Sequence, residues 1–546
     1  MWFLGNASGH DFQFHMASWL DVSGQWREGI LYPRWAEWAN YGFGEPRFIF
    51  YPPASWILGA GLGSILPWRM VPGAFIWIAL VLNGCAMWKL ARLWLTPAQA
   101  AAAAVICAVN PYQLIIAYYR SDFAELLGNA VFPFLVLRAI RVVQNGWRQV
   151  PALAFVFAAM WLTNAPAAVI ATYSLALILL VGAVYRKSLL PLMTGGAAML
   201  FGFGVAAFYI LPAAREQRWV QIGQALTQLL RPASNFIFTR EPDPEFLLFN
   251  WKVSTVAMLV ILVAGIGAVF LARRRRELGF VWWAVLALGV AASALMFAPS
   301  AIIWRLSPKL AFVQFPWRWL GPLGLVFAFV VAAAPSVRRT QVAVWTLAAL
   351  SIAGIGTAMV QDCWWDSEDI PVLAGGIHSG NGYEGTDEYQ PLGSDRYSLP
   401  GSDVPYGDPP GLPAPLVTRW DKETESSVPV PPQSVHIERW TAQNKDFTYV
   451  ANGNENVGVR LLAFPAWAAK VDGIDIKTFG APGIGQLLVP LEAGKHRVTL
   501  RFERTIDRTF ADLVSLLFVV LVSAWQIFLW RSSPGSDEEA QASRAS

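Results

Sequence analysis

Four polar residues near position 120 have the types and the spacing of a site that handles a charged group. Asp122, Glu125 and Asn129 are three and four residues apart, so a helix that begins near residue 122 places them on one face. Arg120 comes just before them, and a guanidinium group can hold a phosphate through paired donors. Polar side chains that continue into an apolar helix indicate a cavity or a pathway. The alternative is structural, with Asp122 capping the helix and Glu125 completing a capping box.

Two other segments contribute candidates for the same chemistry. Arg318 stands between tryptophans in the run 315–319, where an arginine either binds phosphate or anchors a helix at the level of the lipid headgroups. Asp11 lies near the start of the chain, and a carboxylate in a partly dry cleft can deprotonate or orient a hydroxyl group. Alternatively, Asp11 caps a helix. His10 and His15 flank Asp11 and either assist it in binding substrate or are ordinary interface residues.

The elements that position these residues are membrane spans. The chain has 546 residues, of which 55% are apolar and 14% charged, a composition too apolar for a soluble globule. The net charge of +4 gives no reason to expect nucleic acid as a partner, and three cysteines provide neither a disulfide framework nor a metal site. Apolar stretches of about 20 residues can cross the hydrocarbon. They predict eleven spans, near 71–95, 98–117, 122–142, 150–165, 167–185, 189–211, 253–272, 279–298, 315–334, 341–360 and 508–530.

Basic residues gather in every second loop, and this alternation predicts the orientation in the membrane. By the positive-inside bias these loops are cytoplasmic. They contain Lys89/Arg92, Arg138/Arg141/Arg148, Arg186/Lys187, Arg273 to Arg276, Arg338/Arg339 and Arg531. The intervening loops, which carry the candidate residues, then face the exterior. Because exterior-type sequence begins at Gly9 without a helix to deliver it, we also expect a further span upstream.

The pattern between and after the spans predicts the domain organisation. In the first segment, Phe12, Met16 and Trp19 share a helical face opposite Asp11 and His15, which is typical of a helix lying in the membrane interface. Near the C-terminus, short alternating runs with Asn-Gly and Asp-Gly turns predict a β-sandwich. The predicted parts are a first exterior loop with interfacial helices at 1–70, a transmembrane helical core at 71–360, an exterior irregular Pro-rich region at 361–433, an exterior β-sandwich at 434–507, a final span at 508–530 and a cytoplasmic tail at 531–546.

Motifs that occur in order along most of the chain resemble a known family, the bacterial multi-pass membrane proteins catalogued as "6-pyruvoyl-tetrahydropterin synthase-related". They are Gly9-His10-Asp11 with Tyr32-Pro33-Arg34-Trp35 and Tyr51-Pro52-Pro53, then the runs 119–125, 314–318 and 382–389. A pterin synthase needs three histidines close together on strands to hold zinc. The five histidines of this chain are scattered, so we expect no such activity.

The predicted architecture also resembles the GT-C glycosyltransferases, which combine many spans, an acidic first exterior loop and a C-terminal exterior domain. The resemblance implies sugar transfer from a polyprenyl-phosphate carrier to an envelope acceptor, outside the bacterial inner membrane. It implies that Asp11 is a base or a metal ligand. We expect Asp11, Asp122 and Glu125 to be catalytic, with Asp122 and Glu125 as orienting groups, and we expect His10, His15, Arg120, Asn129 and Arg318 to bind substrate.

Two questions stay open at the level of sequence. Mg²⁺ or Mn²⁺ could act as a cofactor, and Glu384, Asp387 and Glu388 form either a cation site or a solvated acidic loop. The competing interpretation of the whole chain is a non-catalytic scaffold or a lipid-handling transporter with an exterior binding domain. A transferase requires Asp11 and the Arg120 cluster to meet in one outward cavity, whereas a scaffold does not.

Overall fold

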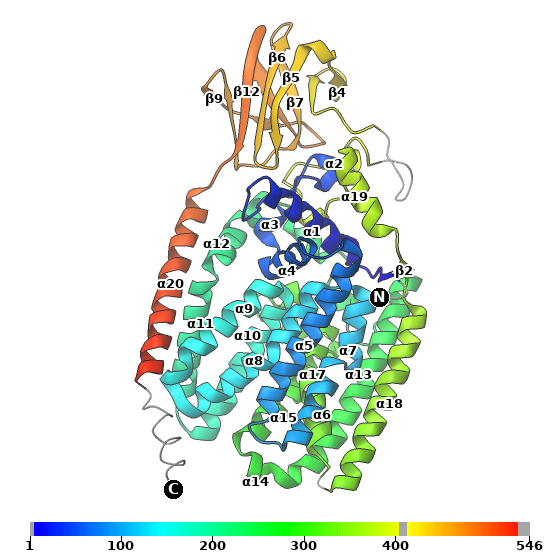
Figure 1. Ribbon diagram of the computed structural model, residues 1–546, viewed down its shortest axis with the longest axis vertical. Helices are drawn as coiled ribbons and strands as arrows, with labels where there is room; N and C mark the ends of the chain where they lie inside the picture. Colours follow the sequence, from blue (N-terminus) through cyan, green and yellow to red (C-terminus); the bar gives the residue numbers. More distant parts are fainter. Residues whose placement is uncertain (1–4, 336, 403–411, 533–546) are drawn as a thin grey trace.

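The protein consists of a bundle of long helices with a β-sandwich at one end (Figure 1). The computed structural model describes residues 5–335, 337–402 and 412–532. We call the end of the bundle next to the sandwich the sandwich face. The main helices of the bundle are α5 (Val71–Ala91), α6 (Pro97–Ala108), α8 (Phe123–Asn145), α9 (Val150–Thr163), α10 (Ala165–Arg186), α11 (Leu190–Val205), α13 (Pro244–Leu271), α15 (Phe280–Leu295), α17 (Leu320–Ala333), α18 (Arg338–Asp362) and α20 (Ile506–Arg531).

The prediction of a multi-pass helical membrane protein is confirmed. Eight helical segments of the described chain are long and apolar enough to cross a membrane, and up to ten if each of two bent pairs is one span. The predicted number was eleven. The difference arises at 123–163, which counts as one segment of 41 residues but contains α8 and α9. Gly146, with φ of +59°, ends α8 and permits the turn between them.

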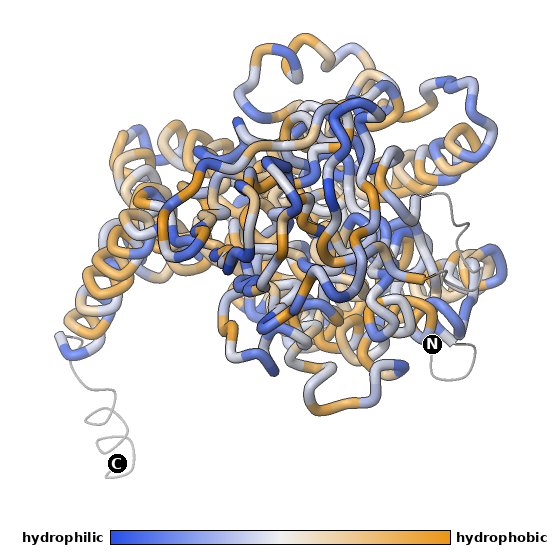
Figure 2. The backbone as a smooth tube through the Cα atoms, turned by 90° about the horizontal axis from the view of Figure 1, so that it is seen from above, coloured by the Kyte–Doolittle hydropathy of each residue, from blue (hydrophilic) through white to orange (hydrophobic). Residues whose placement is uncertain are grey.

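The helices at the edge of the bundle expose apolar side chains, as lipid contact requires. In the most apolar 18-residue stretches of α18 and α20, only 6% and 11% of the residues are buried inside the protein. Seen from above, apolar residues predominate in the peripheral helices (Figure 2). The basic run at Arg273 to Arg276, which leads into α14 (Arg275–Leu278), lies at the end of the bundle opposite the sandwich (Figure 1). Which of the two ends is cytoplasmic stays a prediction.

The first segment packs between the bundle and the sandwich (Figure 1). It forms α1 (Phe12–Arg27), α2 (Ala39–Gly42), α3 (Arg47–Phe50) and α4 (Pro53–Gly63). The apolar stripe of α1 packs against protein rather than lipid, because both faces of the helix are buried, and an interfacial position of α1 stays a prediction. Trp19 on the apolar face is 0% exposed and His15 on the polar face is 1% exposed. Trp19 stacks on Phe75 and occupies the place that a side chain at Gly59 would need.

The C-terminal domain is a sandwich of two five-stranded sheets, with strand orders β10-β11-β7-β3-β4 and β5-β6-β12-β8-β9. Its strands are β3 (Val417–Asp421), β4 (Ser426–Pro429), β5 (Val435–Thr441), β6 (Asn444–Ala451), β7 (Glu455–Leu462), β8 (Trp467–Val471), β9 (Ile474–Ile476), β10 (Phe479–Gly480), β11 (Gln486–Leu491) and β12 (Gly494–Phe502). The first two strands lie within the segment that was predicted to be irregular. Part of its proline cluster, at 403–411, lies outside the described residues, as does most of the predicted tail at 531–546.

The sandwich is fixed to the first segment by apolar and ionic contacts. Trp35 is buried against Trp467 of β8, with ring centroids 5.6 Å apart. Lys445 of β6 pairs with Glu37 at 2.6 Å, and both side chains are buried. A buried ion pair requires its partners to stay together, since separating them leaves an uncompensated charge. The sandwich therefore holds the first segment in place over the bundle.

Candidate functional site

The site is built where the first segment meets the turn before α8. A π-type helical turn, η2 (Ile115–Arg120), ends at Ser121, which has a left-handed φ of +52°. Gly9 approaches this turn so closely that an added Cβ would lie 2.5 Å from the carbonyl carbon of Arg120. The Asp11 amide donates to the Arg120 carbonyl at 2.8 Å, and the Gly9 amide donates to Ser121 Oγ at 3.1 Å. This close backbone contact places Asp11 beside Arg120.

Asp11 forms an ion pair rather than a helix cap. Its Oδ2 accepts a hydrogen bond from Arg120 Nη2 at 2.6 Å. Asp11 stands at the N-cap position of α1, but its side chain makes no capping hydrogen bond. The carboxylate is 34% exposed, whereas the Arg120 side chain is 6% exposed. Asp11 is therefore held from one side by a buried cation and open to the cavity on the other.

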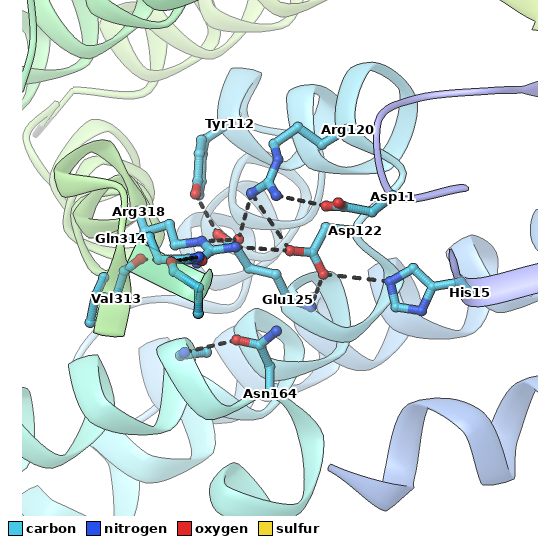
Figure 3. A network of polar contacts seen from close by, with 12 residues as sticks. Asp11, His15, Tyr112, Arg120, Asp122, Glu125, Asn164, Val313, Gln314 and Arg318 are labelled. Carbon is cyan, nitrogen blue, oxygen red and sulfur yellow. Dashed lines mark hydrogen bonds and ion pairs between the residues drawn. The ribbon is translucent and has the colours of Figure 1, made fainter. Parts of the chain in front are cut away.

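Behind this pair, two further carboxylates and a second arginine form a buried network (Figure 3). Glu125 accepts hydrogen bonds from Arg318 Nε at 2.8 Å, from Arg120 Nη1 at 3.2 Å and from the Tyr112 hydroxyl. Asp122 lies 3.3 Å from Arg318 Nη2 and caps α8 by accepting from the Glu125 amide at 2.9 Å. The predicted capping box is only half formed, because the Glu125 side chain turns to the arginines instead.

The two guanidinium groups lie between carboxylates and aromatic rings. The Phe315 and Trp317 rings stack 4.8 Å apart. The Arg120 guanidinium lies 5.2 Å from each ring centroid, and that of Arg318 lies 4.8 Å from Phe315. Arg318 also donates to the Val313 carbonyl at 2.9 Å. Both cations are thus fixed before any ligand arrives.

A cavity of about 990 Å³ opens in front of the network. Asp11 and Asp122 both line it, as the transferase interpretation required, together with Arg120, Arg318 and His10. Partial burial and the Arg120 charge lower the pKa of His10, so this imidazole is mainly neutral at pH 7. The His10 ring also contacts Phe249 edge to face.

Three predicted site residues lie behind the cavity wall. His15 Nε2 is 3.7 Å from Asp122 Oδ1, and the ring is buried among aromatic side chains. Glu125 and Asn129 line a small enclosed space of about 10 Å³ beneath Arg318, roughly the room that one water molecule occupies. Glu125 can position the arginines, but none of the three residues lines the main cavity.

The cavity wall also contains residues that were not assigned to the site from the sequence. Tyr51, Glu388 and Tyr389 line the cavity, and Tyr389 stacks on Phe50. Burial and the nearby Glu45 raise the pKa of Glu388 to about 7. The available signals were the Tyr51-Pro52-Pro53 motif, which had no assigned role, and the 382–389 motif, in which Glu388 had been considered only as a cation ligand or as part of a solvated loop.

The 382–389 run is anchored to the first segment. The Tyr383 hydroxyl donates to Asp21 at 2.8 Å, and the Thr386 amide donates to Glu45 at 2.9 Å. Gly382 has a left-handed φ of +73°, and an added Cβ would lie 2.3 Å from the Trp38 carbonyl oxygen. These contacts fix where the run enters the cavity wall.

Arginines engage most of the acidic side chains that the structure describes at the site and in the acidic loop. The described residues include no group of three or more His, Cys, Asp or Glu that could hold a metal ion. In the buried network the carboxylates are engaged by guanidinium groups, which a cation would have to displace. In the acidic loop, Arg396 pairs with Glu384 at 2.8 Å and with Asp387 at 2.7 Å. A role for Mg²⁺ or Mn²⁺ gains no support from these donors.

Comparison with known proteins gives a likeness to solved structures only. No family model and no curated protein matches the chain, so membership of the pterin-synthase-related family is not shown. The chain is similar to the apo oligosaccharyltransferase of Archaeoglobus fulgidus, with a TM-score of 0.39 and 14% identity over 65% of this chain and 52% of that chain. It is also similar to AglB of the same organism in complex with an inhibitory peptide and a dolichol-phosphate, with a TM-score of 0.38 and 13% identity over 70% and 53%.

A third similar structure is the same oligosaccharyltransferase in complex with Zn and sulfate, with a TM-score of 0.35 and 14% identity over 66% of this chain and 49% of that chain. This chain spans about half the length of these proteins. At such scores the likeness does not decide an activity, so the functional proposal below rests on the site itself.

Proposed function

We propose that this protein is a glycosyltransferase of the GT-C type, which moves a sugar from a polyprenyl-phosphate carrier to a hydroxyl group of an envelope acceptor on the sandwich face. The observation that carries the proposal is the convergence of Asp11, Arg120 and Arg318 on one cavity of about 990 Å³. These residues come from segments that are far apart in the sequence. A scaffold has no need for such a convergence, and its buried charges would be costly without a function.

Asp11 has the position and the free oxygen of a general base. Its Oδ2 is held by Arg120, and none of the described residues donates to Oδ1. The acceptor oxygen attacks the anomeric carbon from the side opposite the phosphate, and its proton passes to Oδ1. The bond between the anomeric carbon and the phosphate oxygen breaks, and the electron pair leaves with polyprenyl phosphate. The configuration at the anomeric carbon is inverted in this step.

Arg120 and Arg318 stabilise the phosphate as negative charge develops on it. A guanidinium group has five N–H donors, so both arginines keep donors for a ligand beside their contacts with carboxylates. Donors that are already oriented need no reorganisation during the reaction, which is the basis of electrostatic catalysis. Asp122 and Glu125 act as positioning residues in this scheme, because they hold the two cations in place.

The remaining cavity wall suits the other parts of the substrates. Trp161, Val169, Ile210 and Ala213 contribute apolar surface from α9, α10 and α12 (Ala207–Glu216), where a prenyl chain can lie. Polar groups of Tyr51, Thr386 and Glu388 line another part and can hydrogen-bond sugar hydroxyls. The cavity wall therefore offers apolar and polar surface in addition to the charged network.

A test in cells can separate a transferase from a scaffold. A strain that lacks the protein is complemented with the wild type, with Asp11→Asn or with Asp243→Asn. Asp243 also lines the cavity, but its carboxylate caps α13 instead of pairing with Arg120. We expect lipid-linked sugar to accumulate in the deletion strain and with Asp11→Asn, and to return to its normal level with the wild type and Asp243→Asn. If no lipid-linked sugar accumulates in the deletion strain, the scaffold interpretation replaces the proposal.

A further inference from the structure

A second hollow, of about 430 Å³, adjoins the cavity of about 990 Å³, which we call the transfer cavity. Two separate segments form it, one at 231–236 and the other at 301–312. Lys309 and Phe312 line both this hollow and the transfer cavity. A molecule in one of the two spaces is therefore next to the other.

Three cations dominate the second hollow. Arg231, Arg305 and Lys309 line it, and all three side chains are exposed. Among the described residues that line the hollow there is no Asp or Glu, so no carboxylate in its wall offsets the positive charge. Phe236 and Trp304 provide an apolar floor. We call this hollow the basic groove.

The basic groove lies at the level where a span ends. Helix α16 (Ala301–Leu306) follows the span α15 after a bend of 96°, so it runs across the span direction. Trp304 faces inward and donates to the Leu295 carbonyl at 3.0 Å. Ile302 and Leu306 face outward and are 59% and 77% exposed. Apolar side chains outside and cations beside them are typical of a helix at the boundary between hydrocarbon and headgroups.

We infer that the basic groove binds the monophosphate of the spent polyprenyl carrier after transfer, before the carrier leaves the protein. The inference rests on the proposed function, because it takes the carrier as the ligand. A phosphate monoester has a charge of about −1.5 to −2 at pH 7, whereas the phosphodiester of an ordinary phospholipid has one negative charge. Three cations without a carboxylate in the groove wall favour the monoester. The shared wall at Lys309 gives the product a path from the transfer cavity.

The test counts bound lipid rather than turnover. The full chain is placed in phosphatidylcholine nanodiscs with a polyprenyl monophosphate, and native mass spectrometry gives the number of lipids bound. Arg231 and Arg305 line the basic groove and not the transfer cavity, so the double variant Arg231→Gln/Arg305→Gln leaves the transfer cavity intact. The matched control is Arg338→Gln/Arg339→Gln, which removes two exposed cations at the start of α18.

We expect the double variant to bind one polyprenyl monophosphate fewer than the wild type and the control. Equal binding by all three proteins would overturn the inference. If an equal amount of phosphatidylglycerol displaced the polyprenyl monophosphate from the basic groove, the inference would also be overturned, because the groove would then accept any anionic lipid. Since the count does not require transfer, a loss of one lipid without measurable transfer would refute the proposed function and leave the groove in place.

Discussion

Replacing Gly9 by alanine tests whether the close approach of the first segment positions the catalytic carboxylate. The added Cβ would lie 2.5 Å from Arg120 C and from the Tyr119 carbonyl oxygen, whereas ordinary contacts begin at 3.4 Å. Both neighbouring atoms belong to the backbone and cannot rotate away. The segment that carries Asp11 must therefore move by about 1 Å. A misplacement of about 1 Å at a reacting group costs on the order of 100-fold in rate, and overpacking costs about 1–3 kcal/mol of stability.

The assay is release of free polyprenyl phosphate from a lipid-linked sugar by the purified protein, with thermal stability measured in parallel. Gly24→Ala is the matched control, because a Cβ at Gly24 in α1 meets no atom within 4 Å. Alanine at this helical position is expected to keep or slightly raise stability. We expect activity to fall about 100-fold in Gly9→Ala and to stay unchanged in Gly24→Ala. Wild-type activity in a folded Gly9→Ala protein would refute the positioning of Asp11 by this contact.

Three further predictions concern charge. Because the pKa of Glu388 is raised to about 7, its carboxyl group bears a proton below pH 7 and becomes negative above it, where it repels an anionic donor. With a repulsion on the order of 1 kcal/mol at an effective dielectric constant of about 20, KM should rise about fivefold through pH 7 in the wild type and stay level in Glu388→Gln. Identical profiles would count against this. Arg318→Lys should lose about 1.5–3 kcal/mol of charge-assisted bonding, so kcat/KM should fall roughly tenfold or more. Arg338→Lys, at the far end of the bundle, should keep the wild-type value, and a normal rate for the Arg318 variant would remove Arg318 from the phosphate site. Impermeant thiol reagents applied to intact cells should label a cysteine placed at position 450 but not one at position 275, and the reverse pattern would invert the predicted orientation.

The sequence was most informative where a single helix carries the residues in question. The spacing of Asp122, Glu125 and Asn129 placed them on one face of α8, and the apolar stretches located the spans, because both properties depend on local periodicity. The meeting of Arg318 with Glu125 could not be predicted in this way, since 193 residues separate them. Tyr112, which donates to the same carboxylate, gave no signal because it lies within a predicted span, where a single tyrosine does not stand out.

Burial of a residue by segments that are distant in the sequence could not be predicted from local sequence patterns either. The stripe on α1 was interpreted as a membrane-facing surface, but Trp19 fills a space that Gly59 of α4 leaves free, and the sandwich covers the segment from above. Strand β3 pairs with β7, which lies about 40 residues further along, and β4 joins the sheet through β3. The prolines that flank β3 and β4 suggested an irregular region. Pairing with neighbouring strands nevertheless makes β3 and β4 part of the sheet.

The central claim, that Asp11 is the base for sugar transfer, is tested most directly by the Asp11→Asn variant. Asparagine keeps the shape of the side chain and can cap a helix about as well as aspartate, but it cannot accept the proton. The purified variant is assayed in nanodiscs with lipid-linked sugar, and both the glycosylated acceptor and the released polyprenyl phosphate are measured. We predict a folded protein that still binds the carrier and has lost at least 100-fold in transfer rate, since general base catalysis contributes about 100-fold to 10,000-fold. Transfer at the wild-type rate by folded Asp11→Asn would contradict the assignment.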